Sequence, residues 1–225
     1  MIIITGITGG IGKFLFDKFS QAGEEIIGTY HLIKPEGKAH EQTVPLDITD
    51  FSQVEKFVAN IKSKNITLIN CAGVSANAFA HKSSVEEWTN VINVNLTGTF
   101  HLIRATLPLM REQNFGRIIN LSSIVSETGV MGTSAYAASK AGLNGMIKSI
   151  ALENAKKGIT INNINLGYFK VGMINTVPEE IQEIIKSKIA SNEFGDPENI
   201  FSTIQYIRNT PYLNGACLDL NGGLV

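Results

Sequence analysis

The sequence has no excess of charge of either sign and no long apolar run. Lys plus Arg number 19 and Asp plus Glu number 20 among 225 residues, so no basic surplus indicates a nucleic-acid partner. No apolar stretch approaches the ~20 residues of a membrane helix, and the opening run Met1–Ile4 is too short for a secretory leader. We therefore expect neither nucleic acid nor a membrane as a partner.

Cysteine is scarce as well. The two cysteines, Cys71 and Cys217, lie far apart and show no metal-ligand spacing. They do not form a disulfide framework, which suits a reducing compartment, so we expect a cytoplasmic location and no metal site. No internal repeat, low-complexity tract or linker divides the chain. Residues 1–225 are therefore expected to form one domain, large enough for a substantial core.

The first chemical signal is a glycine-rich turn near the start of the chain. A β-branched strand over residues 2–4 precedes it, and apolar residues at helical spacing over 14–22 follow it. This succession brings backbone N–H groups and a positive helix terminus to a phosphate. The glycines let the backbone approach it closely. The turn predicts a dinucleotide site with the contact residues Gly6, Thr8, Gly9, Gly10, Ile11 and Gly12.

The second predicted strand, residues 25–29, indicates which dinucleotide binds. An acidic residue at the end of this strand typically holds the ribose hydroxyls of NAD. Here no carboxylate follows until Glu36, whereas His31 and Lys34 could face a 2′-phosphate. NADP(H) is therefore favoured as the cofactor. NAD(H) stays possible, because loop residues of this kind are often only solvated surface.

Further strands alternate with helical patterns, which predicts a parallel sheet with helices on both faces. The expected architecture is a Rossmann-type, doubly wound α/β fold of about seven strands. Ligands bind at the carboxyl edge of such a sheet. Asp47 either caps the next helix or contacts the nucleotide. The nucleotide contacts predicted after the later strands are Asp47, Ile48, Asn70, Ala72, Gly73, Gly167 and Phe169.

A possible proton-transfer group lies in the stretch 122–140. Tyr136 and Lys140 are one helical turn apart, and a nearby ammonium group favours the phenolate and lowers the pKa of a tyrosine. Ser123, at the end of the strand over 117–121, could hold a substrate oxygen. Taken alone, Tyr136 and Lys140 could equally be a solvated helix pair. Their place beside the predicted dinucleotide site favours proton transfer.

Together these motifs resemble the short-chain dehydrogenase/reductase family along the whole chain. The matching residues are Thr5-Gly6-x-x-x-Gly10-x-Gly12, Asp47, Asn70-Cys71-Ala72-Gly73, Asn95, Ser123, Tyr136-x-x-x-Lys140 and Asn221-Gly222-Gly223. The resemblance implies a catalytic tetrad of Asn95, Ser123, Tyr136 and Lys140, in which Tyr136 and Lys140 also contact the cofactor. On its residues alone, Asn95 could instead be a buried amide that satisfies backbone groups.

The resemblance is greatest to the 3-oxoacyl-carrier-protein reductase branch, and it implies a homodimer or homotetramer. The expected reaction is reduction of a ketone, either a 3-oxoacyl thioester or a related carbonyl, with NADPH and a proton from Tyr136. The alternative is a nucleotide-binding member with little catalysis that acts as a partner or sensor. That alternative rests on Leu166 and Val171, which replace the family's usual proline and threonine. A short segment at about 168–194 is expected to cover the substrate.

Overall fold

A single parallel sheet organises the molecule. The structure is a computed structural model that describes residues 1–35 and 42–224, and within them seven strands pair in the order β3-β2-β1-β4-β5-β6-β7. Their bounds are β1 Ile2–Thr5, β2 Ile26–Tyr30, β3 Thr43–Pro45, β4 Thr67–Asn70, β5 Gly116–Ser123, β6 Ile159–Leu166 and β7 Cys217–Leu220. The first three strands are added outward from β1 on one side, and β4 to β7 are added outward on the other side. The strand order therefore changes direction between β1 and β4, as in a doubly wound fold. This confirms the predicted fold class.

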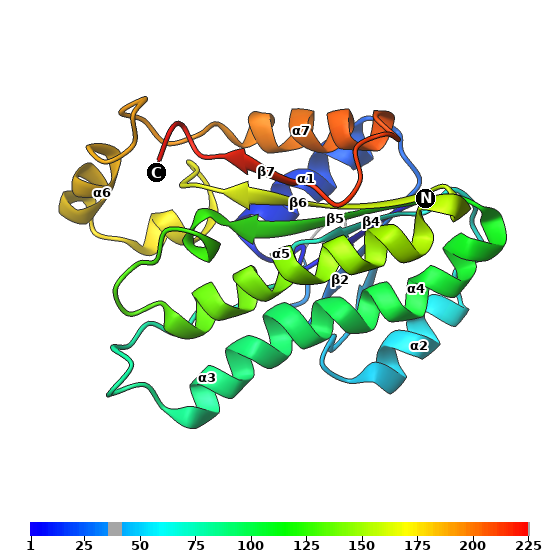
Figure 1. The fold of residues 1–225 in the computed structure, drawn as a ribbon, viewed down its shortest axis with the longest axis horizontal. Helices are drawn as coiled ribbons and strands as arrows, with labels where there is room; N and C mark the ends of the chain where they lie inside the picture. Colours follow the sequence, from blue (N-terminus) through cyan, green and yellow to red (C-terminus); the bar gives the residue numbers. More distant parts are fainter. Residues whose placement is uncertain (36–41, 225) are drawn as a thin grey trace.

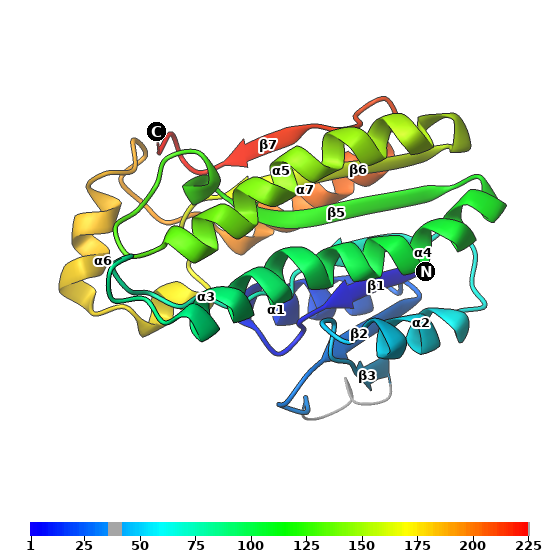
Figure 2. The same ribbon diagram turned by 60° about the horizontal axis from the view of Figure 1, so that its bottom comes forward.

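Helices cover both faces of the sheet (Figure 1). One face carries α1 (Gly10–Gln21) and α7 (Pro197–Asn209). The other carries α2 (Phe51–Ala59), α4 (Thr99–Gln113) and α5 (Ser134–Asn154), with α3 (Val85–Ile92) leading into α4. The short α6 (Glu179–Lys186) lies beyond the sheet, at the end toward which the strands point (Figure 2).

The two core layers follow from the alternation of side chains along each strand. Ile3, Leu68 and Ile118 are fully buried in the layer under α2, α4 and α5. Ile4 and Ile69, their chain neighbours, are fully buried in the layer under α1 and α7. A strand that is buried on both faces reads as a continuous apolar run, which explains why the sequence signals the strands so clearly.

Several element boundaries differ from the sequence prediction, and three of the differences lie near the candidate site. The strand expected over 44–48 is Thr43–Pro45, so Asp47 lies in the following turn. The helix expected from Tyr136 begins at Ser134. The long helical region is interrupted by a π-helical turn, Asn93–Gly98, between α3 and α4. A π-helical turn accommodates an extra residue within a helix, and such turns often lie at functional sites.

All the strands end at the same edge of the sheet, and the candidate residues follow them there. The N-terminus lies at the opposite end of the molecule, and the C-terminus lies near α6 (Figure 1). Glu36, the first carboxylate after β2, lies outside the described residues. Over the part of the chain that the structure describes, the helices are too short or too polar to cross a bilayer.

Candidate active site

The glycine-rich turn packs tightly against the loop that follows β4. Gly6 adopts φ +70°, and a Cβ atom there would lie 2.7 Å from the Ala72 Cα atom. The Thr5 hydroxyl oxygen accepts hydrogen bonds from the backbone N–H groups of Cys71 and Ala72, both at 3.1 Å. Only glycine tolerates this combination of positive φ and close backbone contact. The turn is therefore held in an open shape that exposes its backbone.

A cavity of about 580 Å³ opens from this turn along the ends of β1, β2 and β4. It brings together many of the predicted nucleotide contacts. Its lining includes Gly6, Thr8, Gly9, Thr29, Tyr30, His31, Leu32, Leu46, Asp47, Ile48, Thr49, Cys71, Ala72, Gly73, Val74, Asn90 and Val94. The lining is thus mixed, with Thr8, His31 and Asp47 among its polar side chains.

Asp47 closes the far end of this cavity. Its Oδ1 atom accepts from the Thr49 backbone N–H at 2.9 Å and from the Thr49 hydroxyl at 2.7 Å, and its Oδ2 atom lies 3.7 Å from His31 Nε2. Burial opposes ionisation, but the bonds from Thr49 and the charge of His31 outweigh it and lower the pKa of Asp47. The helix cap is a different residue, because Asp50 accepts from Ser52 N–H and caps α2.

Lys140 and Tyr136 lie side by side at the start of α5. The Lys140 Nζ atom donates to the Leu121 carbonyl oxygen at 2.6 Å and lies 5.5 Å from the centroid of the Tyr136 ring. The Ser123 side chain, at the end of β5, interacts with the Tyr136 phenol and lowers its pKa. Ser123 also accepts from the backbone N–H of Val125 at 3.3 Å. Three of the four predicted catalytic side chains are thus in one group.

Asn95 joins this group from the π-helical turn. Its Oδ1 atom accepts from the Val74 N–H at 2.8 Å, and its Nδ2 atom donates to the Val74 carbonyl at 2.9 Å and to the Ser139 hydroxyl at 3.1 Å. A Cβ atom at Gly73 would lie 3.3 Å from Asn95 Oδ1 and 3.8 Å from Lys140 Nζ. Asn95 is fully buried. It does satisfy backbone groups, and in doing so it ties the loop after β4 to α5.

The remaining predicted contacts lie outside the lining of this cavity. Gly12 and Asn70 are buried, and Gly10 packs against the segment after β6, where a Cβ atom on it would lie 2.5 Å from Gly172 N and 3.1 Å from Val171 Cγ2. Ile11, the next residue, is only partly buried. The glycine turn therefore contacts the loop after β4 on one side and the segment after β6 on the other.

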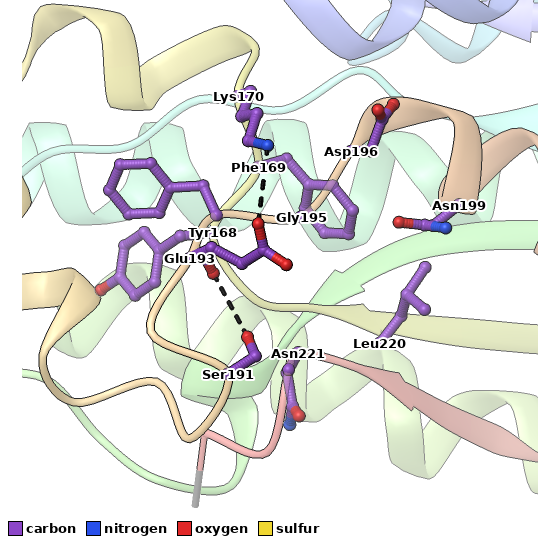
Figure 3. A pocket seen from close by; sticks show the side chains of 12 residues that line it. Tyr168, Phe169, Lys170, Ser191, Glu193, Gly195, Asp196, Asn199, Leu220 and Asn221 are labelled. Carbon is purple, nitrogen blue, oxygen red and sulfur yellow. Dashed lines mark hydrogen bonds and ion pairs between the residues drawn. The ribbon is translucent and has the colours of Figure 1, made fainter.

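A second cavity, of about 440 Å³, lies behind that segment, between the ends of β6 and β7 and the start of α7 (Figure 3). Phe169 is buried and lines it, and an ion pair of 3.8 Å joins Lys170 to Glu193 beside it. Gly167 sits against Asn221, because a Cβ atom there would lie 2.7 Å from the Asn221 Cα atom. Phe169 thus faces this second cavity, and Gly167 packs against the chain that follows β7.

Comparison with known proteins identifies this arrangement. The short chain dehydrogenase family matches residues 1–182. The chain belongs to this family. It is 34% identical to an acetoacetyl-CoA reductase of Rhizobium meliloti, over 98% of this chain and 96% of the relative. It is 33% identical to the 3-oxoacyl-(acyl-carrier-protein) reductase FabG of Thermotoga maritima and 32% identical to that of Haemophilus influenzae, in each case over 99% of this chain and 96% of the relative.

As a short-chain dehydrogenase, the protein is an oxidoreductase that uses a nicotinamide cofactor and acts on a carbonyl. The residues present fit a dinucleotide. The glycine turn forms one wall of the cavity through Gly6, Thr8 and Gly9, and the exposed Gly9 has no side chain to block a phosphate there. The cavity then runs from this wall to Asp47. The alternative of a family member with little catalysis is not favoured, because these relatives are all reductases.

The electrostatics of the dehydrogenase site differ from the sequence expectation. Burial raises the pKa of Tyr136 above its ordinary value, while the bond from Ser123 lowers it by less. Burial lowers the pKa of Lys140 to about 8. The net lowering of the Tyr136 pKa that the sequence predicts from Lys140 is therefore not found, because burial is the largest influence on the pKa of Tyr136. Tyr136 is therefore a neutral phenol at pH 7, suited to giving a proton.

Two residues that position the site were not among the predicted catalytic or cofactor-binding residues. Thr5 holds the loop after β4, and Ser139 accepts from Asn95 while its own hydroxyl donates to the Tyr136 carbonyl at 2.7 Å. Ser139 is fully buried. Its place three residues after Tyr136 was a usable signal, because residues at this spacing share a helix face.

Proposed function

We propose that this short-chain dehydrogenase reduces the ketone of a 3-oxoacyl thioester with NADPH. The observation that carries the proposal is the group formed by Ser123, Tyr136 and Lys140 at the edge of the sheet where the glycine turn also lies. Bound NADPH supplies the hydride that reduces the carbonyl carbon. Tyr136 gives its proton to the carbonyl oxygen, which Ser123 holds in place. Lys140 is the neighbouring proton source that restores the phenol.

The thioester is supported by the relatives and by the surface around the site. Acetoacetyl-CoA reductase and 3-oxoacyl-(acyl-carrier-protein) reductase are names of enzymes that act on thioesters. Exposed apolar side chains lie on the loop after β5 (Met131, 85% exposed) and on α6 (Ile181 and Ile184, 46% and 52%). These elements share the carboxyl end of the sheet (Figure 2), and the segment 168–194 would cover an apolar acyl group there.

The preference for NADPH rests on the end of β2. His31 lines the cavity there and Lys34 follows on the exposed loop, so both could face a 2′-phosphate. Titration of the protein with each nucleotide tests this preference. NADPH should bind more tightly than NADH, and tighter binding of NADH would refute the preference.

The reaction itself is tested by following NADPH oxidation with a panel of 3-oxoacyl thioesters and simple ketones. Turnover should be fastest with a thioester. Tyr136→Phe should remove most turnover and leave nucleotide affinity nearly unchanged, because only the proton donor is lost. Wild-type turnover in that variant would reject the mechanism, and tight nucleotide binding without turnover on any carbonyl would reject the function.

We also propose a homodimer or homotetramer in the cytoplasm. Exposed apolar side chains on the outer faces of α4 and α5, such as Phe100 (44%) and Leu152 (85%), support association through these helices. The two free cysteines suit a reducing compartment. Light scattering on the eluting protein would give the subunit number, and a monomer at micromolar concentration would contradict the assembly.

A further inference from the structure

A row of buried asparagines crosses the sheet next to the candidate active site. Asn70 on β4 lies beside Asn120 on β5, which lies beside Asn163 on β6. Asn70 Nδ2 donates to Asn120 Oδ1, and Asn120 Nδ2 donates to Asn163 Oδ1, both at 2.8 Å. All three side chains are at most 4% exposed.

The row continues into the helix that carries the candidate catalytic residues. Asn163 Nδ2 donates to Asn144 Oδ1 on α5 at 2.8 Å, and Asn144 Nδ2 donates to the Ser126 hydroxyl at 3.0 Å. Ser126 belongs to the 3-10 turn Ile124–Ser126, directly after Ser123. We call the five linked side chains, Asn70, Asn120, Asn163, Asn144 and Ser126, the amide chain.

The amide chain includes residues of both elements that supply Ser123, Tyr136 and Lys140, which are β5 and α5. Asn144 lies four residues after Lys140 and eight after Tyr136, on the same face of α5. Asn120 directly precedes Leu121, whose carbonyl accepts from Lys140. Asn70, at the β4 end of the amide chain, directly precedes the loop that lines the nucleotide cavity. The side chains that form it are not themselves in the group of reacting residues.

Buried amides of this kind fix geometry more than they add stability. A typical hydrogen bond contributes about 1 kcal/mol net, whereas a buried donor left without a partner costs about 1–3 kcal/mol. Sliding or rotating α5 would break the Asn163–Asn144 bond and leave buried amide groups unpaired. Among the described residues, Asn70 Oδ1 at the β4 end has no hydrogen-bond partner. The other amides each use both their oxygen and their nitrogen.

We propose that the amide chain positions α5 on the sheet, so that Tyr136 and Lys140 meet Ser123 and the nucleotide cavity in one fixed arrangement. Asn144 and Asn163 are its positioning residues, since their bond is the link between the helix and the sheet. Misplacing reacting groups by about 1 Å can cost on the order of 100-fold in rate. The inference rests on the proposed roles of Ser123, Tyr136 and Lys140.

Asn144→Leu breaks the link with little change in volume. It should lower kcat about tenfold or more while KM and the Kd for the nucleotide stay within about twofold, because only the alignment of α5 is lost. Asn144→Asp keeps an oxygen that accepts from Asn163 and should retain several-fold more of kcat. The control is Asn154→Ala, which removes another buried amide from the far end of α5, where it accepts from Arg111. Its kcat should stay at the wild-type value.

A third variant separates positioning from stability. Asn120→Val, Asn144→Leu and Asn163→Val together remove both partners of the two bonds between these amides, and they leave the Asn70 Nδ2 group without its acceptor, as Asn144→Leu alone leaves that of Asn163. This triple variant should unfold at no lower temperature than Asn144→Leu and still have low kcat. Wild-type kcat in the triple variant or in Asn144→Leu would overturn the proposal. An equal loss of kcat in Asn144→Leu and Asn154→Ala would also overturn the proposal. An equal loss of kcat in Asn144→Leu and Asn144→Asp would do the same.

Tyr136→Phe, measured in parallel, distinguishes failure of this inference from failure of the proposed function. Loss of turnover in Tyr136→Phe together with unchanged turnover in Asn144→Leu would overturn the amide chain alone. Unchanged turnover in Tyr136→Phe would reject the proposed site and the inference with it.

Discussion

The buried ammonium group of Lys140 should destabilise the folded protein at neutral pH, and this contribution of Lys140 should fade at alkaline pH. Lys140 is 6% exposed, and burial lowers its pKa from 10.5 to about 8. Between these two values Lys140 is more fully protonated in the unfolded chain than in the folded protein, so the contribution of Lys140 to stability rises with pH across this window. Each pH unit corresponds to about 1.4 kcal/mol, so the charged form costs about 3 kcal/mol below pH 8.

Lys140→Met removes the charge and keeps most of the apolar stem. The variant loses one hydrogen bond to the Leu121 carbonyl, worth about 1 kcal/mol. It should therefore be more stable than the wild type by about 2 kcal/mol at pH 6.5, and this advantage should disappear by about pH 10.5. Turnover should be lost at every pH, because the proposed proton source is gone.

Urea unfolding at pH 6.5 and pH 10, followed by circular dichroism, measures this difference. Lys148→Met is the matched control, since Lys148 lies on the same helix and is exposed, and it should change stability little at either pH. A Lys140→Met variant that is less stable at pH 6.5, or whose difference from the wild type is the same at both pH values, would refute the reasoning.

Two further substitutions test the turn and the helix that frame the nucleotide cavity. Gly6→Ala should cost about 1–3 kcal/mol in backbone strain and weaken nucleotide binding, because its Cβ atom would collide with Ala72. The control Gly23→Ala, with a similar positive φ and open space around it, should leave the nucleotide affinity unchanged. Equal nucleotide affinities of the two variants in a calorimetric titration would contradict this prediction. Asp50→Ala should lower the unfolding free energy by about 1 kcal/mol through loss of the α2 cap and leave kcat unchanged; a fall in kcat would mean that this cap also supports the site.

Much of the fold was predictable because the central strands of a parallel sheet are mostly apolar on both faces. The end of β3 was not, since Leu46 continues the apolar pattern beyond Pro45 and still donates its N–H to the Tyr30 carbonyl. The π-helical turn was hidden for a similar reason. Its apolar spacing resembles that of a regular helix, and only the contact of Asn95 with Val74 shows why an extra residue is accommodated.

The candidate site was predictable as a set of residues, and its electrostatics were not. Spacing places Tyr136 and Lys140 on one helix face, but it says nothing about burial, which dominates both pKa values. The amide chain was equally invisible. Asn120 and Asn163 read as isolated polar residues within apolar strands, and only the register of β5 and β6 brings them together.

The two substitutions that favoured a weakly catalytic protein have a structural explanation. Leu166 is 6% exposed and packs in the layer under α1 and α7, and its backbone lies in register with Leu220. A leucine therefore continues β6 where the family usually has a proline. Val171 packs against the glycine turn at Gly10, so it replaces a hydroxyl by an apolar contact without moving the segment away. Leu166 thus keeps its place in β6, and Val171 keeps the segment after β6 in contact with the glycine turn, so both residues are compatible with hydride transfer at the proposed nicotinamide end.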